Sequence, residues 1–353
     1  MASKTEHLLI VRFSALGDVA MLAPVVSALA TQYPQLRITV LSRGFARPFF
    51  DGLAHNVGFM EADLERDCKG IRGLNALYRR LKAKHFTAVA DMHGVLRTHY
   101  LRLRFRMDRF RVAHIDKHRA GKRQLVRPRN KRLVQQPTSF QNYADVLARL
   151  GYPVRLEFRS IFPPQGGNLR LLAPDHLHEK KPFEKWIGVA PFAAHRGKVL
   201  EPEKTEAVVR TLLQKHPNGR VFLFGGGREE RATFARWCAD MPRCFAAADL
   251  LHGLSEELIL MSHLDVMVSM DSANQHLASL VGTPVVSVWG ATHPYAGFLG
   301  WGQTTANVVQ TELACRPCSI YGNKPCMRGD WACLAAITPD MVVRRVEYVL
   351  DHR

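Results

Sequence analysis

Hydrophobic residues follow two alternating spacings along the chain. Short continuous apolar runs at 7–13 (HLLIVRF), 36–42 (LRITVLS) and 85–92 (HFTAVADM) are typical of buried strands, whereas residues 18–31 show helical spacing. A weaker strand-like run lies at 110–114 (FRVAH). Strands that alternate with helices predict a parallel sheet that is covered on both faces.

The alternation stops and then restarts in the second half. Residues 163–184 are rich in Pro, Gly and charge and show little periodicity, which predicts a linker. Strand-like runs resume at 185–190, 220–224, 264–269 and 284–289. We therefore expect two Rossmann-like, doubly wound α/β domains that face a central cleft. The expected bounds are 1–165 for the N-terminal domain, 166–184 for the linker, 185–338 for the C-terminal domain and 339–353 for a closing helix that packs on either domain, the N-terminal one included.

Two acidic residues stand at the ends of strands in the first half. Asp18 lies just past the strand 7–13, where its carboxylate either caps a helix or takes a proton from a bound hydroxyl. Asp91, at the end of the strand 85–92, is the rival for the second role. Pro24 cannot donate to the carbonyl of Ala20, so the helix that contains Asp18 should kink or begin with a short lead-in turn.

In the second half, all four strands are followed by small, polar or glycine-rich residues: PFAAHRGK, GGGREE, MDSANQHLAS and GATHP. Ligands of open parallel sheets bind beyond the carboxyl ends of the strands, and small residues let the backbone approach them closely. The four segments together predict a ligand site at this edge. Neither P-loop nor GxGxxG spacing occurs, so kinase-like or nicotinamide chemistry has no direct support.

The segment MDSANQHLAS contains the clearest candidate for a phosphate site. Asp271 or Ser272 caps the helix that begins there, and the free N–H groups at its positive end suit a phosphate. His276 lies one turn further on the same face, and Lys198, next to Gly197, adds a point charge for a diphosphate. The alternative interpretation is a capped helix with a half-buried histidine, and a surface lysine without function.

The charge changes the picture, because 49 Lys and Arg residues outnumber 31 Asp and Glu residues, for a net charge of +18. Such a surplus indicates an acidic partner: nucleic acid, an anionic membrane or a phosphorylated substrate. Residues 97–132 hold fourteen Lys or Arg residues against Asp108 and Asp116 alone. This segment is either a solvated surface or the contact for an anionic acceptor and an anionic membrane leaflet, and we favour the second interpretation.

No apolar stretch is long enough to span a bilayer, and the N-terminal residues lack the pattern of a secretory signal. We therefore expect a cytoplasmic protein that lies peripherally on the inner face of the cytoplasmic membrane. Seven cysteines without an export signal argue against a disulfide framework. The spacing Cys315-x2-Cys318-x7-Cys326-x6-Cys333 resembles a four-thiolate zinc site only loosely, so both a structural metal and free thiols stay open.

Two motifs resemble glycosyltransferase family 9, the heptosyltransferases of lipopolysaccharide core assembly. The first is RFSALGDVAMLAPVVSAL after the N-terminal strand, and the second is SMDSANQHLASLVGTPVVSVWGATHP. The resemblance implies a GT-B fold and inverting transfer without a metal or other cofactor. It also implies a nucleotide-sugar donor, expected to be ADP-heptose, and an anionic lipopolysaccharide core acceptor.

By this resemblance Asp18 matches the catalytic base and Lys198 the phosphate-binding lysine. The matching donor-binding residues are Lys198, Asp271, Ser272, Ala273 and His276. The acceptor contacts expected in the basic segment and near Asp18 are Ser14, Arg97, Arg102, Arg119, Lys122 and Arg123. The chain departs from the family pattern at Ala273, which replaces a glycine, and at Ala193 and Ala194, where hydroxyl residues often contact the donor phosphate.

Two other functions remain as alternatives. A nucleotide-sugar epimerase of GT-B type would convert the donor without any acceptor. A basic nucleic-acid-binding protein would account for the charge, although no recognised nucleic-acid motif accompanies it and we expect no nucleic acid as partner.

Overall fold

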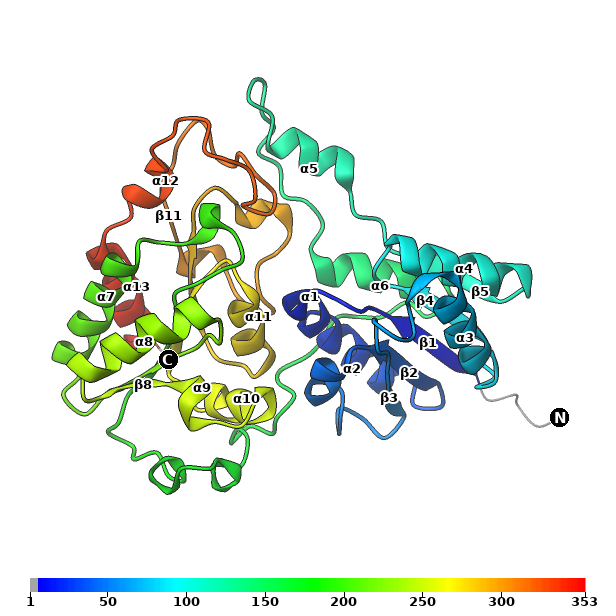
Figure 1. Cartoon of the computed structure of the whole chain (residues 1–353), viewed down its shortest axis with the longest axis horizontal. Coiled ribbons are helices and arrows are strands. Elements are labelled where there is room, and N and C mark those ends of the chain that lie inside the picture. The colour runs from blue at the N-terminus through cyan, green and yellow to red at the C-terminus, as the bar shows by residue number, and fades with distance from the viewer. Residues whose placement is uncertain (1–5, 353) are drawn as a thin grey trace. The chain divides into compact units, whose positions relative to one another are not determined.

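The computed structural model describes residues 6–352, which form two compact units (Figure 1). Unit 1 contains the residues through Lys117 together with 137–161, and unit 2 contains 118–136 together with the residues from Phe162 onward. The expected boundary at residue 165 lies close to the observed one at Ile161. Segment 118–136, which we expected in the N-terminal domain, instead packs with the second unit.

Unit 1 is a five-stranded parallel sheet in the order β3-β2-β1-β4-β5, with helices between the strands. The strands are β1 (His7–Val11), β2 (Arg37–Ser42), β3 (Val57–Glu61), β4 (Ala88–Asp91) and β5 (Arg111–His114). The helices are α1 (Leu16–Ala20), α2 (Leu22–Gln32), α3 (Gly70–Lys82), α4 (Leu96–Met107) and α6 (Ser139–Arg149), with a 3-10 turn η1 at Gly44–Phe49. The continuous apolar run of β1 is buried at every position, as its central place in the sheet requires.

Unit 2 repeats this arrangement with six parallel strands in the order β11-β10-β9-β6-β7-β8. The strands are β6 (Trp186–Ala190), β7 (Arg220–Leu223), β8 (Cys244–Ala246), β9 (Val266–Met270), β10 (Val285–Trp289) and β11 (Val308–Gln310). The helices are α7 (Pro202–Lys215), α8 (Arg228–Asp240), α9 (Ala247–Leu250), α10 (Leu254–Ser262), α11 (Ala273–Leu280), α12 (Ala332–Ala335) and α13 (Pro339–Asp351). Short 3-10 turns complete the unit: η2 (Leu169–Leu171), η3 (Asp175–Leu177), η4 (Arg196–Lys198), η5 (Pro294–Ala296) and η6 (Thr305–Asn307).

Segment 118–136 contains helix α5 (Arg119–Leu125) and lies against the loops of unit 2. The ammonium group of Lys131 donates to the backbone carbonyls of Ala314, Cys315 and Pro317 at 3.3, 2.7 and 2.9 Å. The backbone N–H of Gln136 donates to the carbonyl of Tyr295 at 2.8 Å. We call this segment the strap, since both its helix and its return limb are held by the same unit.

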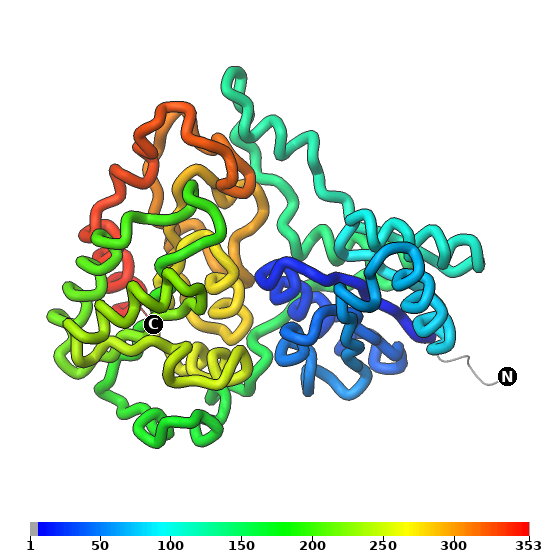
Figure 2. The backbone as a smooth tube through the Cα atoms, in the orientation of Figure 1, coloured from blue at the N-terminus to red at the C-terminus, as the bar shows by residue number. Residues whose placement is uncertain are grey.

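The two segments whose place the sequence left open also pack within unit 2. In the expected linker, η2 lies beside α10 (Figure 2), and the Gly167 N–H donates to the Ser262 hydroxyl at 2.9 Å. The closing helix α13 packs on α7 and on strands β9 and β10, and its Val342, Val343 and Val346 join the core of that sheet. Among residues 6–352, no helix has the length and apolar character that crossing a membrane would require.

Candidate active site

Both sheets have a topological switch point, where neighbouring strands carry connections that leave in opposite directions. In unit 1 this point lies between β1 and β4, and in unit 2 it lies between β6 and β9. Parallel sheets bind their ligands beyond the carboxyl ends of the strands at such points. Asp18 follows β1 and Asp91 ends β4. Lys198 and Asp271 follow β6 and β9, so every one of these candidates stands at a switch point.

The loop after β1 leads directly into a divided helix. Helix α1 ends at Ala20, Met21 separates the two helices, and α2 begins at Leu22. Pro24 is the third residue of α2, and it has no N–H to donate to the carbonyl of Ala20. The expected lead-in turn before the proline is therefore confirmed. Asp18 occupies the third position of α1 rather than its N-cap, and its carboxylate accepts from the Ala15 N–H at 3.2 Å.

A buried arginine holds the carboxylate of Asp18. Arg12 lies at the end of β1, and its Nη2 is 2.7 Å from Asp18 Oδ2. Its other terminal nitrogen donates to the Met92 carbonyl, and its guanidinium lies 5.5 Å from the ring centroid of Tyr143. Burial opposes the Arg12 cation, but Tyr143 and Asp18 outweigh it and raise its pKa. The side chain of Asp18 is 32 % exposed against 8 % for Arg12, so Asp18 is the more accessible member of the pair.

Asp91, the other candidate base, has structural partners on both of its carboxylate oxygens. Its carboxylate is almost fully buried, and Oδ1 accepts from the N–H groups of His93 and Gly94 at 2.9 Å each. Its Oδ2 lies 3.2 Å from Nε of Arg102, which is itself buried. Asp91 therefore stabilises the turn after β4 through backbone hydrogen bonds, and it contacts α4 through Arg102. Its buried carboxylate has little access to an acceptor hydroxyl.

His93 stands next to Ser14 at the same edge of the sheet. Its Nε2 lies 3.3 Å from the Ser14 hydroxyl, which we expected to contact an acceptor. Burial first, and then the charges of Arg12 and Lys117, lower the pKa of His93 to about 4. The imidazole is therefore neutral at pH 7 and offers a hydrogen-bonding nitrogen without adding positive charge.

In unit 2, Lys198 and Asp271 form a buried ion pair. Lys198 Nζ lies 2.9 Å from Asp271 Oδ2, and these side chains are 15 % and 3 % exposed. The second oxygen of Asp271 accepts from the Gln275 amide at 3.1 Å. Gln275 also donates to the Phe298 carbonyl at 3.4 Å, so the pair is linked to the loop after β10.

Helix α11 begins directly beside this pair. Ser272 is its N-cap residue, but its side chain makes no cap hydrogen bond and its hydroxyl lies 3.3 Å from that of Ser269. The expected side-chain cap is therefore missing from Ser272. The first N–H groups of α11 keep the capacity to bind an anion, helped by the helix dipole. Ala273 opens the helix, and His276 is buried one turn further along.

Glycines bring the loops of this edge together. A Cβ atom on Gly197 would lie 2.7 Å from the Gly322 carbonyl oxygen, so the loops after β6 and around residue 322 touch through bare backbone. Gly322 has a φ of +74°, and a Cβ there would lie 2.6 Å from Cγ of Lys198. The stem of Lys198 thus lies against the Gly322 backbone, which fixes the direction of its ammonium group.

The loop after β10 is organised by Arg316, which is buried. Its guanidinium donates to the carbonyls of Gly290, Thr311 and Thr292 and, at 3.0 Å, to the side chain of Gln310. By contrast, the glycine-rich turn GGGREE is closed by its own helix, since Glu230 accepts from the N–H groups of Gly226 and Gly227. That turn therefore offers a ligand fewer free amides than its sequence suggests.

The expected acceptor contacts lie in three different environments. Arg97 is exposed near the start of α4, whereas Arg102 is buried against Asp91. Arg119 and Arg123 are exposed on α5 of the strap. Lys122 is buried, with its ammonium group 4.3 Å from the ring centroid of Phe298. Because Phe298 also contacts Gln275, Lys122 belongs to the surroundings of the Lys198–Asp271 pair.

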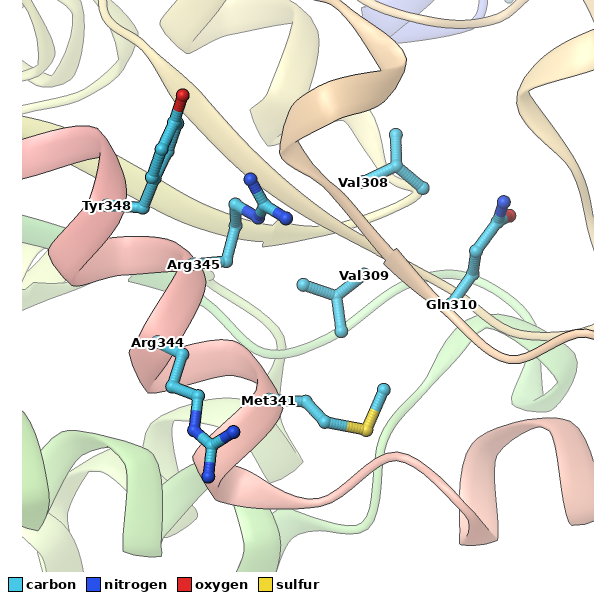
Figure 3. Close-up of a pocket in the computed structure, with 7 residues that line it drawn as sticks. All are labelled: Val308, Val309, Gln310, Met341, Arg344, Arg345 and Tyr348. Carbon is cyan, nitrogen blue, oxygen red and sulfur yellow. The ribbon is translucent and has the colours of Figure 1, made fainter. Parts of the chain in front are cut away.

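Cavities were found on each unit. One of about 540 Å³ in unit 1 lies beyond β2 and β3 and is lined by Arg43, Glu61, Asp63 and Arg97, among others. Another of about 370 Å³ in unit 2 lies between the edge strand β11 and α13, where Val309 and Met341 face each other beneath Arg345 and Tyr348 (Figure 3). The first contains one residue of the predicted acceptor set, and the second contains no candidate residue.

The cysteines of unit 2 are reduced in the structure. Within residues 6–352, no group of three or more His, Cys, Asp or Glu side chains is arranged to hold a metal ion. Burial raises the pKa of Cys333 to about 11 and also raises that of Cys318, so both are protonated thiols at pH 7.

Sequence reasoning missed Arg12, His93 and Arg316. Arg12 directly follows the strand-like run of β1, and His93 lies two residues after Asp91. Strands β1 and β4 are neighbours in the sheet, so the two residues could have been predicted at one site if the strand order had been known. Arg316 lies in the irregular segment CRPC, where nothing in the periodicity indicates that a charged side chain is buried.

The sequence profile described as glycosyltransferase family 9 (heptosyltransferase) matches residues 74–326, which is more than two thirds of the chain. The matched range begins after Asp18, so the role of that residue rests on its geometry and local motif. No curated protein sequence matches the chain.

Solved structures with a similar fold were also found. Escherichia coli heptosyltransferase WaaC with ADP is 18 % identical, covers 97 % of this chain and 99 % of its own, and has a TM-score of 0.70. E. coli ADP-heptose lps heptosyltransferase II is 16 % identical, with 98 % and 99 % covered and a TM-score of 0.70. A family 9 glycosyltransferase from Veillonella parvula is 17 % identical, with 100 % and 99 % covered and a TM-score of 0.72. The expected GT-B fold class, with two Rossmann-like parallel sheets, is confirmed.

Proposed function

Because the chain belongs to glycosyltransferase family 9 and is a glycosyltransferase, we propose that it transfers a heptose from ADP-heptose to an anionic lipopolysaccharide core acceptor. The family description and the similar folds, which include a heptosyltransferase with ADP and an ADP-heptose heptosyltransferase, support this donor. The basic surface supports an anionic acceptor.

The departing diphosphate binds to unit 2. Lys198 neutralises its charge, and the first N–H groups of α11 donate to its oxygens. Asp271 orients the lysine through their 2.9 Å ion pair, and Gly322 supports its stem. The donor site is completed by residues of α11. Ser272 and Ala273 lie at the start of this helix, and His276 lies one turn further along it. The single observation that carries the proposal is this ion pair next to a helix start whose Ser272 side chain makes no cap bond, at the switch point of a family 9 sheet.

The acceptor hydroxyl is activated by Asp18 of unit 1. Asp18 takes the hydroxyl proton while the oxygen attacks the anomeric carbon, and the bond from that carbon to the diphosphate oxygen breaks. The attack inverts the configuration at that carbon, and the leaving electron pair stays on the diphosphate. Arg12 directs the carboxylate of Asp18 through their 2.7 Å ion pair. The proposed steps need no metal.

The acceptor itself is held by exposed cations. Ser14, which His93 contacts, lies beside the base, and Arg97 lies at the cavity beyond β2 and β3. Arg119 and Arg123 of the strap extend the positive surface for the anionic core. We assign Arg102 a structural role under Asp91, and we assign Lys122 to the donor side because it contacts Phe298.

The proposal is tested by removing the lysine of the donor site. We expect Lys198→Ala to lower kcat/KM by about 100-fold or more, because an electrostatic contact to the leaving group is lost. Thermal-shift titrations with ADP-heptose and ADP should show weaker binding for this variant. Lys215→Ala, at an exposed position on α7, is the matched control and should retain both activity and binding. Unchanged turnover in Lys198→Ala would contradict the donor site.

The same assay separates the alternatives. A transferase consumes ADP-heptose only when the core acceptor is present, whereas an epimerase converts the donor alone. A polynucleotide-binding protein would bind RNA or DNA with a steep dependence on salt, and would show little response to nucleotide sugars.

A further inference from the structure

Helix α4 of unit 1 carries a stripe of exposed apolar side chains. Leu96, Leu103 and Met107 are 86 %, 56 % and 68 % exposed. At 3.6 residues per turn these three positions lie within about 40° of one another around the helix axis. They therefore form one continuous line along the outer face of the helix, which we call the α4 stripe.

The fold of unit 1 does not need this stripe. The opposite face of α4 supplies Leu101 and Phe105 to the hydrophobic core, and both are buried. Thr98 bonds to the backbone of Val95 at the helix start. Since these contacts already hold the helix, the exposed side chains of the α4 stripe are available to a binding partner outside the unit.

Positive charge lies on both sides of the stripe. Helix α4 has the sequence LRTHYLRLRFRM, with four arginines and no acidic residue. Arg106 and His99 lie on one side of the stripe and Arg97 on the other, and all three are exposed. The neighbouring helix α3, which packs on α4, adds exposed Ile71 and Arg72.

We propose that the α4 stripe docks on the surface of an anionic phospholipid bilayer. A narrow apolar line with an exposed arginine on each side, Arg97 and Arg106, matches the interface of such a bilayer. The apolar side chains of the α4 stripe enter the headgroup region, and these two arginines bind lipid phosphates. A second copy of the chain fits less well, because a two-fold contact would bring Arg97 and Arg106 against the same positive face. The inference rests on the proposed function in one respect, that the acceptor is anchored in a membrane.

The inference also separates the roles of the basic segment 97–132. The strap is held by unit 2 through Lys131 and Gln136, and its exposed apolar residues, Leu133 and Val134, lie in the return limb rather than along a helix. Helix α4 alone combines an ordered apolar line with flanking arginines within that segment. The membrane contact is therefore assigned to α4 rather than to the whole basic segment.

The test measures binding of the full chain to sedimented vesicles. One vesicle preparation contains phosphatidylglycerol and phosphatidylethanolamine, and the other contains phosphatidylcholine alone. We expect the wild-type chain to bind the first and not the second. The double variant Leu103→Gln/Met107→Gln should lower the partition coefficient by about tenfold or more, because the apolar side chains no longer enter the bilayer.

Matched variants control for charge and for general surface apolarity. Leu171→Gln changes a leucine that is 63 % exposed in unit 2, and it should bind vesicles as the wild type does. Arg106→Gln should weaken binding at low salt and differ little from the wild type at high salt. Circular dichroism and the Tm of each variant confirm that it is folded.

Two results would overturn the proposal. One is wild-type vesicle binding by Leu103→Gln/Met107→Gln, or no binding by the wild type itself. The other is a dimer in light scattering that the double variant dissociates, which would make the stripe an interface between copies. A lipid-free core acceptor keeps this test distinct from that of the proposed function: the double variant should turn it over within about twofold of the wild type. If the wild type transferred no sugar but still bound the anionic vesicles, only the proposed function would be refuted.

Discussion

At the scale of single residues, the candidate site depends on how each ionisable group is paired. Asp18 and Asp91 follow adjacent strands of one sheet, and both lie near arginines. Asp91 is buried and accepts two backbone hydrogen bonds, whereas Asp18 keeps about a third of its side chain exposed. Both carboxylates stand near the end of a strand, and their burial distinguishes the structural Asp91 from Asp18, the proposed base.

The sequence could suggest Asp18, Lys198, Asp271 and His276, because each follows a strand or begins a helix. It could not suggest that Arg12 pairs with Asp18, since an arginine at the end of an apolar strand is normally exposed. Nor could it assign Lys122, whose ammonium group lies on the ring of Phe298, far away in the sequence. Contacts of this kind depend on tertiary structure, and no local pattern encodes them.

A half-buried histidine, His293, contributes to the pH dependence of stability. Burial first, and then Arg316 and Lys131, lower the pKa of His293 to about 4, below the ordinary value of 6.5. Between about pH 6.5 and 4, His293 is protonated in the unfolded chain and still neutral in the folded chain. The free energy of unfolding therefore falls as the pH decreases through that range. His93, with a pKa also lowered to about 4, acts in the same direction.

We expect His293→Asn to reduce this loss of stability. In the wild type, the Tyr295 N–H donates to His293 Nδ1 at 3.1 Å. The asparagine side chain also has an acceptor for this N–H, but asparagine does not titrate. Urea unfolding at about pH 7, 6 and 5 measures the slope, and the variant should show a shallower one than the wild type. Equal slopes in the two proteins would mean that His293 is not held in its neutral form.

At the scale of elements, most central strands could be predicted and several edge strands could not. Strands β3, β8 and β11 were all missed, and each lies at the edge of its sheet. Strands β8 and β11 have only three residues each, and β3 is mostly half-buried or exposed. Their sequences therefore lack the continuous apolar run by which β1 or β9 is recognised. The division of α1 from α2 was predictable because it follows from the covalent structure of Pro24.

The strap is the element whose place differs most from expectation. Its sequence lies between β5 and α6 of unit 1, yet its contacts are with the loops of unit 2. Burial lowers the pKa of Lys131, which nevertheless donates to three carbonyls. Sequence order predicted the wrong unit for this segment, because a few side-chain contacts outweigh the position of the strap along the chain.

Removing the ammonium group of Lys131 should therefore release the strap. We expect Lys131→Met to speed hydrogen exchange of the backbone amides in 126–136 by about tenfold or more, since hydrogen bonds to a charged group contribute about 1.5–3 kcal/mol. The neighbouring exposed Arg132→Met is the control and should leave exchange unchanged. Wild-type protection in Lys131→Met would show that other contacts hold the strap.

At the scale of the whole molecule, one strand order is used twice. The order 3-2-1-4-5 of unit 1 recurs in unit 2 with one further strand, and each unit has its reactive groups at its own switch point. Unit 1 presents a carboxylate beside an arginine, and unit 2 presents a lysine beside a helix start. These complementary charges suit an incoming alcohol on one unit and a departing diphosphate on the other, which is the central claim of the proposed mechanism.

The most direct test compares Asp18→Ala with the wild type in two measurements on one preparation. Transfer from ADP-heptose to the core acceptor should fall by about 1,000-fold, within the range for loss of a general base. The Kd for ADP, measured by calorimetry, should stay within about twofold, because the proposed nucleotide site lies in unit 2 and Asp18 lies in unit 1. Near-wild-type transfer by Asp18→Ala, or loss of ADP binding equal to the loss of transfer, would contradict the assignment of Asp18 as the base.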